Sequence, residues 1–257
     1  WNGLMLGAFA RASAVFGEAK YRTAAEKNLG FIREKLWDTK SNTLFHRWRD
    51  DQRDNVQLLE GYAFLLSGVI ELYETALEQE HLDFAIELAE AMLAKFYDAK
   101  DGGFWQSASG AKDLILRVKD DYDGAEPGGN SVAALSLLKL GAITGRKDFT
   151  EAGEKTLRLF ARRLQKFPQA MPFMLHALDF SLQEPKRVVI AGESVSPEFQ
   201  ELLRAAHSVY QPNKIVLGST GAVEEFARTL PAKGGALVYL CTGNSCRPPT
   251  GDAADLR

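Results

Sequence analysis

Cysteine, histidine and long apolar runs are scarce in this sequence, and each scarcity excludes a class of protein. The 257 residues include 2 cysteines and 4 histidines, and they contain no Asn-x-Ser/Thr glycosylation site. These features give no support for secretion. No apolar run approaches the ~20 residues that a membrane-spanning helix needs. We therefore expect a cytoplasmic protein, or a fragment of one, with no membrane partner.

A clear excess of charge of one sign is also lacking. The formal net charge is −3, from 31 basic and 34 acidic residues, and the basic residues are dispersed along the chain. Nucleic-acid binders usually concentrate basic residues in a patch or stripe, so we expect no nucleic-acid partner. Hydrophobic residues make up 46% of the chain and charged residues 25%, which is typical of a folded globular protein.

The cysteines and histidines match no redox or metal-binding motif. Cys241 and Cys246 have four residues between them, whereas a dithiol redox motif has two, and no further ligands complete a zinc site. The histidines are far from one another in the sequence. We therefore expect no metal and no cofactor, and a structural or incidental role for the cysteine pair.

A unit of two helices and a hairpin repeats about every 60 residues. Leu36-Trp37-Asp38-Thr39-Lys40 corresponds to Phe96-Tyr97-Asp98-Ala99-Lys100, and an aromatic-rich stretch follows each. Upstream, Tyr21, Leu82 and Phe149 each open an amphipathic helix, 61 and then 67 residues apart. Repeats of this length indicate stacked units that bury their apolar faces against one another.

Two kinds of helix alternate within these units. Residues 4–15, 62–76 and 132–143 are apolar almost all round, whereas 149–164 carries an apolar stripe on a charged surface. A helix of the first kind is buried and one of the second kind faces water on one side. The alternation predicts the inner and outer layers of an α/α toroid. The expected helices cover about 2–17, 20–36, 57–77, 80–97, 129–144, 148–166 and 169–183.

Short β elements complete the predicted fold. Residues 37–48 and 97–106 have the pattern of β-hairpins. After Pro185, short apolar or β-branched runs flank a helical stretch at 197–207, which is typical of an α/β unit with a parallel sheet. We therefore expect a mainly α protein: a partial α/α toroid over 1–184, similar to six-hairpin glycosidases, and a small α/β subdomain over 185–257.

The segment from Lys119 to Ser131 is the richest candidate site. It brings four acidic residues, a tyrosine, an amide and two adjacent glycines to the start of a buried helix. Trp1-Asn2 and Glu60-Gly61-Tyr62 occupy the same place at the other two inner helices, so the three helix starts should meet at one rim. Carboxylates beside aromatic rings suit acid–base chemistry on sugars. The alternative is a solvated turn in which Asn130 or Ser131 caps the next helix.

Several sequence blocks, in this order, resemble one family. They are Trp1-Asn2-Gly3-Leu4-Met5, Tyr62-Ala63-Phe64-Leu65, Asp123-Gly124-Ala125 with Pro127, Asn130-Ser131-Val132-Ala133, and Cys241 with Cys246-Arg247-Pro248-Pro249. The chain resembles the carboxyl-terminal part of the spermatogenesis-associated, thioredoxin-domain protein family over nearly its whole length. The resemblance implies an amino-terminal thioredoxin-like domain, absent here, and a six-hairpin toroid similar to N-acylglucosamine 2-epimerases.

The resemblance also suggests which residues would act. Positions that match the family's blocks are Trp1, Asn2, Tyr62, Lys119, Asp120, Asp123 and Asn130. Gly61 departs from the family pattern, because an aspartate usually precedes the tyrosine. If that carboxylate is the catalytic acid, this chain is inactive or uses Glu60 instead.

Two functions follow from these observations. The first is a toroid that binds or modifies carbohydrate, as a sugar epimerase, isomerase or glycosidase, with Asp123 and Asp120 as the catalytic pair. The substrate-binding residues would be Trp1, Asn2, Tyr62, Trp105, Lys119 and Asn130. The second is a non-enzymatic helical scaffold or interaction module that supports the missing thioredoxin-like domain. The acidic and aromatic rim favours the first function, and Gly61 favours the second.

The number of helices adds one expectation about partners. A closed six-hairpin toroid needs about twelve helices, and seven are expected here. The first two helices should therefore expose an apolar patch near Leu4, Met5 and Phe9, and the missing amino-terminal half of the same protein would cover it.

Overall fold

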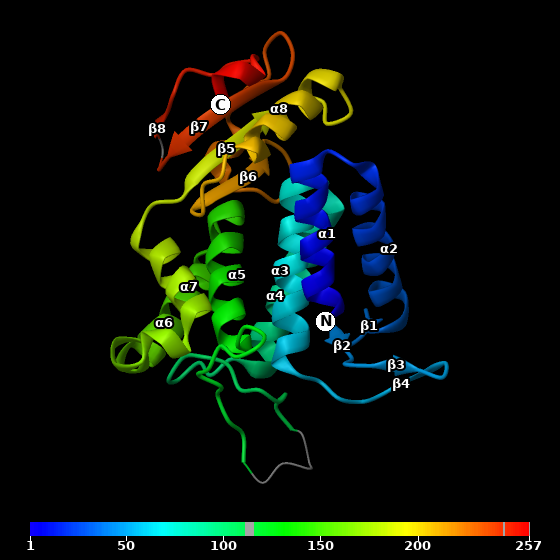
Figure 1. Ribbon diagram of the computed structural model, residues 1–257, viewed down its shortest axis with the longest axis vertical. Coiled ribbons are helices and arrows are strands. Elements are labelled where there is room, and N and C mark those ends of the chain that lie inside the picture. Colours follow the sequence, from blue (N-terminus) through cyan, green and yellow to red (C-terminus); the bar gives the residue numbers. More distant parts are fainter. Residues whose placement is uncertain (111–115, 244, 257) are drawn as a thin grey trace.

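Seven helices form two curved layers, as the alternation of apolar and striped segments predicts. The computed structural model describes residues 1–110, 116–243 and 245–256. The inner helices are α1 (Asn2–Phe16), α3 (Leu59–Ala76), α5 (Gly129–Thr144) and α7 (Pro172–Leu182), each packed beside the next. The outer helices are α2 (Ala19–Lys35), α4 (Gln79–Phe96) and α6 (Lys147–Lys166), each packed against the preceding inner helix. The fold is a partial α/α toroid (Figure 1).

Burial separates the two layers. Helix α5 buries 13 of its 16 residues, whereas α6 buries 7 of its 20. The buried positions of α6 follow a helical spacing through Phe149, Ala152, Phe160 and Leu164, so one stripe faces the core. Helix α7 begins three residues later than expected, because Met171 precedes a proline and takes a non-helical conformation.

Glycines let α1 lie against α3 and so place the first residues of the chain at the start of α3. A Cβ added to Gly68 would lie 2.5 Å from the carbonyl oxygen of Gly3, and one added to Gly3 would lie 2.5 Å from the backbone nitrogen of Leu65. Neither position tolerates a side chain without moving backbone.

The hairpins after α2 and α4 contain the same aspartate turn. The first contains β1 (Trp37–Asp38) paired with β2 (Thr43–Leu44), and a further pair follows, β3 (Trp48–Arg49) with β4 (Gln52–Arg53). In the second hairpin only Tyr97 and Phe104 pair. The carboxylate of Asp38 accepts from the backbone of Lys40, and that of Asp98 accepts from the backbone of Lys100. This matched Asp turn explains the repeat seen in the sequence.

The C-terminal residues form a small α/β subdomain, as expected, but its sheet is mixed rather than parallel. The strands are β5 (Lys186–Ala191), β6 (Lys214–Gly218), β7 (Leu237–Thr242) and β8 (Ser245–Cys246), in the order β6-β5-β7-β8. Helix α8 (Pro197–Ser208) connects the parallel pair β5 and β6, whereas β7 runs antiparallel to β5. Between β6 and β7 the chain has only the short α9 (Glu225–Arg228), too short for the usual helical crossover.

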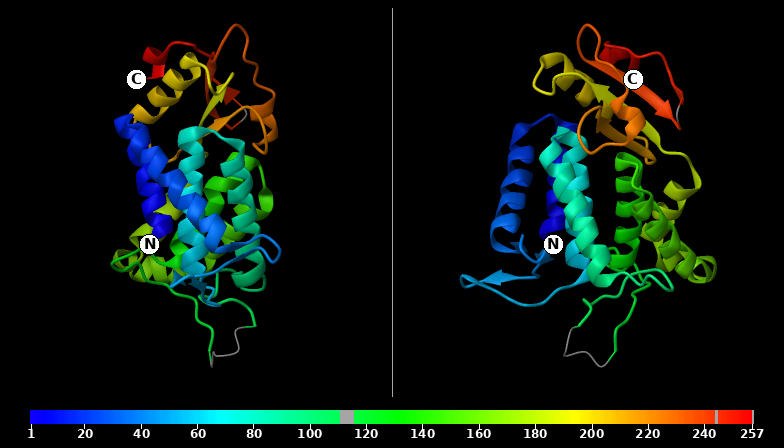
Figure 2. Two further views of the ribbon diagram at one scale, coloured as in Figure 1. Left: turned by 90° about the vertical axis from the view of Figure 1, so that its right-hand side faces the viewer. Right: turned by 180° about the vertical axis from the view of Figure 1, so that it is seen from behind.

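The sheet packs on the ends of the inner helices, away from the hairpins (Figure 2). The carboxylate of Glu74 on α3 accepts from the backbone nitrogen of Val216. The backbone carbonyl oxygen of Glu74 lies 2.8 Å from Nε2 of His207. Val189 and Ile215 belong to the same core as the helices, while Val188 packs in a second core under α8. Cys241 and Cys246 form a disulfide between β7 and β8. The domain boundary after residue 184 falls between α7 and β5 and stays a prediction.

Candidate functional site

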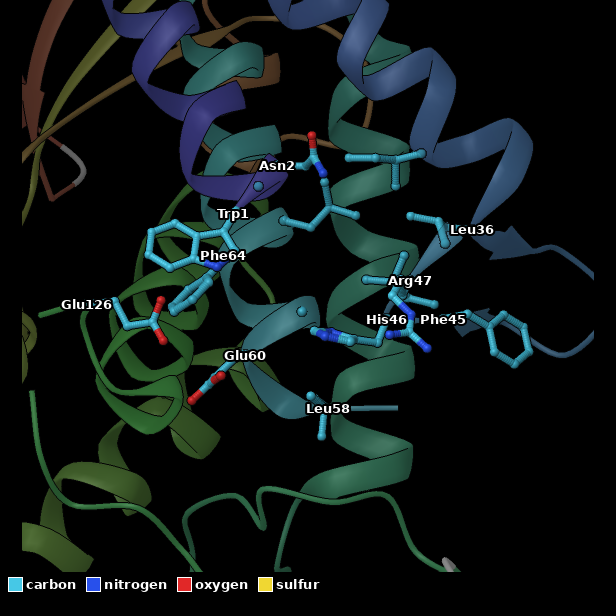
Figure 3. Close-up of a pocket in the computed structure, with 15 residues that line it drawn as sticks. Trp1, Asn2, Leu36, Phe45, His46, Arg47, Leu58, Glu60, Phe64 and Glu126 are labelled. Carbon is cyan, nitrogen blue, oxygen red and sulfur yellow. The ribbon is translucent and has the colours of Figure 1, made fainter. Parts of the chain in front are cut away.

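All four inner helices begin at the end of the molecule where the hairpins lie (Figure 1). There a cavity of about 300 Å³ opens between the starts of α1 and α3, the end of α2 and the first hairpin. We call this cavity the rim pocket. Its polar and aromatic lining includes Trp1, Asn2, His46, Arg47, Glu60 and Glu126 (Figure 3). The predicted meeting of Trp1-Asn2 with Glu60 is therefore found in the structure.

Glu60 has the most unusual ionisation at this pocket. Burial raises the pKa of the Glu60 carboxyl, and the negative charges of Glu126 and Asp120 raise it further, against a smaller opposing effect of His46. Figure 3 shows the side chains of Glu60 and Glu126 on the same side of the pocket, below the Trp1 indole. A carboxyl group whose pKa is raised by burial and by nearby acidic residues is a feature of general acids.

Trp1 and Asn2 stand at the mouth of the pocket. The Trp1 side chain is 84% exposed, so its ring is free to stack on a ligand. The backbone of this first turn is fixed, because Met5 donates to the carbonyl oxygen of Trp1 and Asn28 donates to that of Asn2. An exposed indole above carboxylates is a common way to hold a sugar ring.

Asp123, predicted as catalytic, has both carboxylate oxygens occupied by backbone donors. Oδ1 accepts from Gly128 at 2.7 Å, and Oδ2 accepts from Phe173 at 2.8 Å and Met174 at 3.2 Å. The residue is 8% exposed and lies at the start of α7. These contacts make Asp123 a cap for α7. Its catalytic role stays a prediction.

Three of the predicted binding residues hold the hairpins. The Asn130 side chain accepts from the backbone nitrogen of Phe104 at 2.7 Å and donates to the same residue's carbonyl oxygen at 2.9 Å. Lys119 Nζ donates to Asp98 at 2.8 Å. The Tyr62 hydroxyl accepts from the backbone nitrogen of Leu44 at 2.7 Å, and burial raises the pKa of Tyr62 to about 12. Asn130 thus spans from α5 to the hairpin rather than capping α5.

The remaining predicted residues lie beside these anchors. The Trp105 ring has Lys119 Nζ 4.5 Å from its centroid and the guanidinium carbon of Arg117 at 5.1 Å. The Asp120 carbonyl oxygen accepts from Asn130, while its carboxylate acts on Glu60 through space. Asp120 is therefore the member of the predicted catalytic pair that couples to the rim pocket.

Three residues that line the rim pocket are absent from the predicted catalytic and binding residues: His46, Arg47 and Glu126. Glu126 lies within the acidic segment from Lys119 to Ser131, so the sequence could have predicted its place in the site. His46 and Arg47 follow β2, and nothing in their spacing indicates that the hairpin folds back over the start of α3.

A second cavity, of about 430 Å³, lies on the inner side of the arc, between α1, α3, α5 and α7, and we call it the axial cavity. Gly3 and Phe64 line both cavities. Its charges are paired: Arg11 lies 2.5 Å from Glu71, and Lys139 lies 3.4 Å from the same carboxylate. Burial opposes ionisation of Glu71, but these two cations outweigh it and lower the pKa of Glu71 to about 2.

Two solved structures with the same architecture are cellobiose 2-epimerases. A cellobiose 2-epimerase from Bacillus thermoamylovorans superposes with a TM-score of 0.52 at 16% identity, over 62% of this chain and 42% of that chain. At this identity the match shows the fold, an α/α toroid, and not the activity. In the described residues, no helix is long and apolar enough to cross a membrane.

Sequence comparison identifies the family. Spermatogenesis-associated protein 20 of Rattus norvegicus is 35% identical over 100% of this chain, and the human protein is 33% identical over the same extent. No family model matches the chain. The chain belongs to the spermatogenesis-associated protein 20 family and spans about a third of the length of these relatives. The resemblance of the sequence blocks to the spermatogenesis-associated family is confirmed. The thioredoxin-like domain that it implies stays a prediction.

Proposed function

We propose that the rim pocket binds a carbohydrate. The observation that carries this proposal is the combination of the exposed Trp1 ring with Glu60 and Glu126 in one cavity. An aromatic face stacks on the apolar side of a sugar ring, and carboxylates accept hydrogen bonds from its hydroxyls. The fold shared with cellobiose 2-epimerase supports the choice of ligand class.

Within this proposal each residue has a distinct role. Trp1 stacks on the ring and Asn2 hydrogen-bonds a hydroxyl. Glu60 is the proton donor if the protein is an enzyme, because its raised pKa keeps the carboxyl protonated to higher pH. Glu126 and Asp120 serve as hydrogen-bond acceptors or as the base. Glu60 thus replaces the carboxylate that Gly61 lacks.

A second candidate function is a scaffold, and the open edge of the arc favours it. Met5, Val15 and Phe16 on α1 are each at least half exposed, and Phe31 on α2 is 42% exposed. Apolar surface of this kind is typical of an interface. In this reading the edge packs against further helices, supplied by the rest of a longer protein, and the rim pocket has no ligand.

Ligand titration separates the two functions. Isothermal titration calorimetry with cellobiose and with other disaccharides gives a dissociation constant for the wild-type chain. We expect at least a tenfold loss of affinity for Trp1→Ala and for Glu60→Gln. Tyr210→Ala is the matched control, because Tyr210 is 89% exposed and lies after α8, far from the rim. Saturable binding that neither rim variant alters would disprove the site, and no binding at all would favour the scaffold.

A further inference from the structure

His81 is buried without a hydrogen-bond partner. It lies in the first turn of α4, is 7% exposed, and neither ring nitrogen makes a hydrogen bond within the described chain. Buried imidazoles usually satisfy at least one nitrogen. The ring therefore sits where a further partner would stabilise it.

Two carboxylates lie next to this ring. Glu78 is the N-cap residue of α4, and one of its oxygens lies 3.2 Å from His81 Nε2. Glu26 comes from α2, and one ligand atom from each of the three residues lies within 4.8 Å of the other two. Helices α2 and α4 run side by side in the outer layer (Figure 2, left). The group thus joins two successive units of the arc.

We propose that Glu26, Glu78 and His81 bind a divalent transition-metal ion, with Zn²⁺ the best match. One imidazole with two carboxylates is a zinc donor set, whereas Mg²⁺ and Ca²⁺ take oxygen ligands. Bonds of about 2.0–2.2 Å to the metal require the ligand atoms to close slightly from their present spacing.

Arg22 competes with the metal for the carboxylates. Its guanidinium donates to Glu26 at 2.6 Å and also to Glu78. A metal ion must displace at least part of this contact, and the remaining positive charge weakens its binding. Arg22 is partly exposed, so its side chain can turn toward solvent. None of the three residues lines the rim pocket, so the inference is independent of the proposed carbohydrate function.

Zinc titration of the whole chain tests the site. Competition with a chromophoric chelator gives the Zn²⁺ affinity, and Co²⁺ absorption reports the coordination of the bound ion. We expect one site in the wild type, a tenfold or greater loss for His81→Gln and for the half-exposed Glu26→Gln, and a gain of at least tenfold for Arg22→Met. The matched control is Arg33→Met, because Arg33 pairs with Glu80 between the same two helices without a histidine.

The variants keep the test decisive if one of them fails to fold. Glu26→Gln changes a partly exposed side chain and should leave the core intact. Zn²⁺ should also raise the melting temperature of the wild type, since it binds the folded state. Zinc binding that survives both ligand substitutions would overturn the inference. Zinc binding by the Arg22→Met variant but not by the wild type would also overturn it. Arg22 would then occupy both carboxylates in the natural protein and prevent metal binding.

Discussion

The rim pocket and the axial cavity both border helix α3, but they shift the pKa of their acidic residues in opposite directions. Glu60 and Glu71 both belong to α3. Glu60 faces Glu126 and Asp120, and its pKa is raised, whereas Glu71 is held by Lys139 and Arg11, and its pKa falls to about 2. A carboxylate paired with cations is a structural element, while one among like charges is available for chemistry. From this contrast we propose that function lies at the rim and that the axial cavity contributes stability.

The largest effect should come from breaking the ion pairs of the axial cavity. Lys139 lies 3.4 Å from Glu71 and 3.3 Å from Glu74, and its side chain is 12% exposed. Lys139→Met leaves buried carboxylates without this cation, so we expect a loss of about 3–5 kcal/mol in the free energy of unfolding. Urea denaturation measures it, with the exposed Lys166→Met as control. A loss below about 1 kcal/mol would show that the pairs are not structural.

Asp123 should give the next largest effect. In the wild type, backbone N–H groups donate to both carboxylate oxygens of Asp123. In Asp123→Asn an amide nitrogen, which cannot accept, replaces one of these oxygens. We expect a loss of about 1.5–3 kcal/mol, the usual contribution of hydrogen bonds to a charged group. The folded variant should still bind the rim ligand. A variant with unchanged stability and no ligand binding would instead support the catalytic role that the sequence predicts for Asp123.

These two residues also show what sequence can and cannot supply. The repeat and the helix periodicity locate the seven helices of the arc and the hairpins at 37–48 and 97–106, because each depends on local pattern. The pair β3 and β4 was not predicted. The hydrogen bonds of Asp123 depend on the position of the start of α7, and Phe173 there is fifty residues from Asp123 in the sequence. Tyr62 likewise points to the backbone of Leu44 rather than to the rim. Side-chain direction within a correctly predicted site requires the fold.

The smallest effect should come from Glu60. Its pKa is raised in the folded protein above the ordinary value of 4.5, so folding favours the protonated form. The contribution to stability is present below pH 4.5 and is lost as pH rises through the folded pKa. Glu60→Gln should therefore be slightly more stable than wild type at pH 7 and equal to it in acid. Urea denaturation at the two pH values gives the comparison, and a variant that is less stable at pH 7 would contradict the assignment.

Direct titration of Glu60 tests the central claim that the rim pocket is the functional site. Carboxyl-carbon NMR of the wild-type chain, with Glu60→Gln used to assign the resonance, gives the pKa with and without a saturating disaccharide. The account predicts a pKa above 4.5 in the free protein and a clear change when the sugar binds. A Glu60 that titrates at its ordinary value, and that the sugar leaves unchanged, would contradict it.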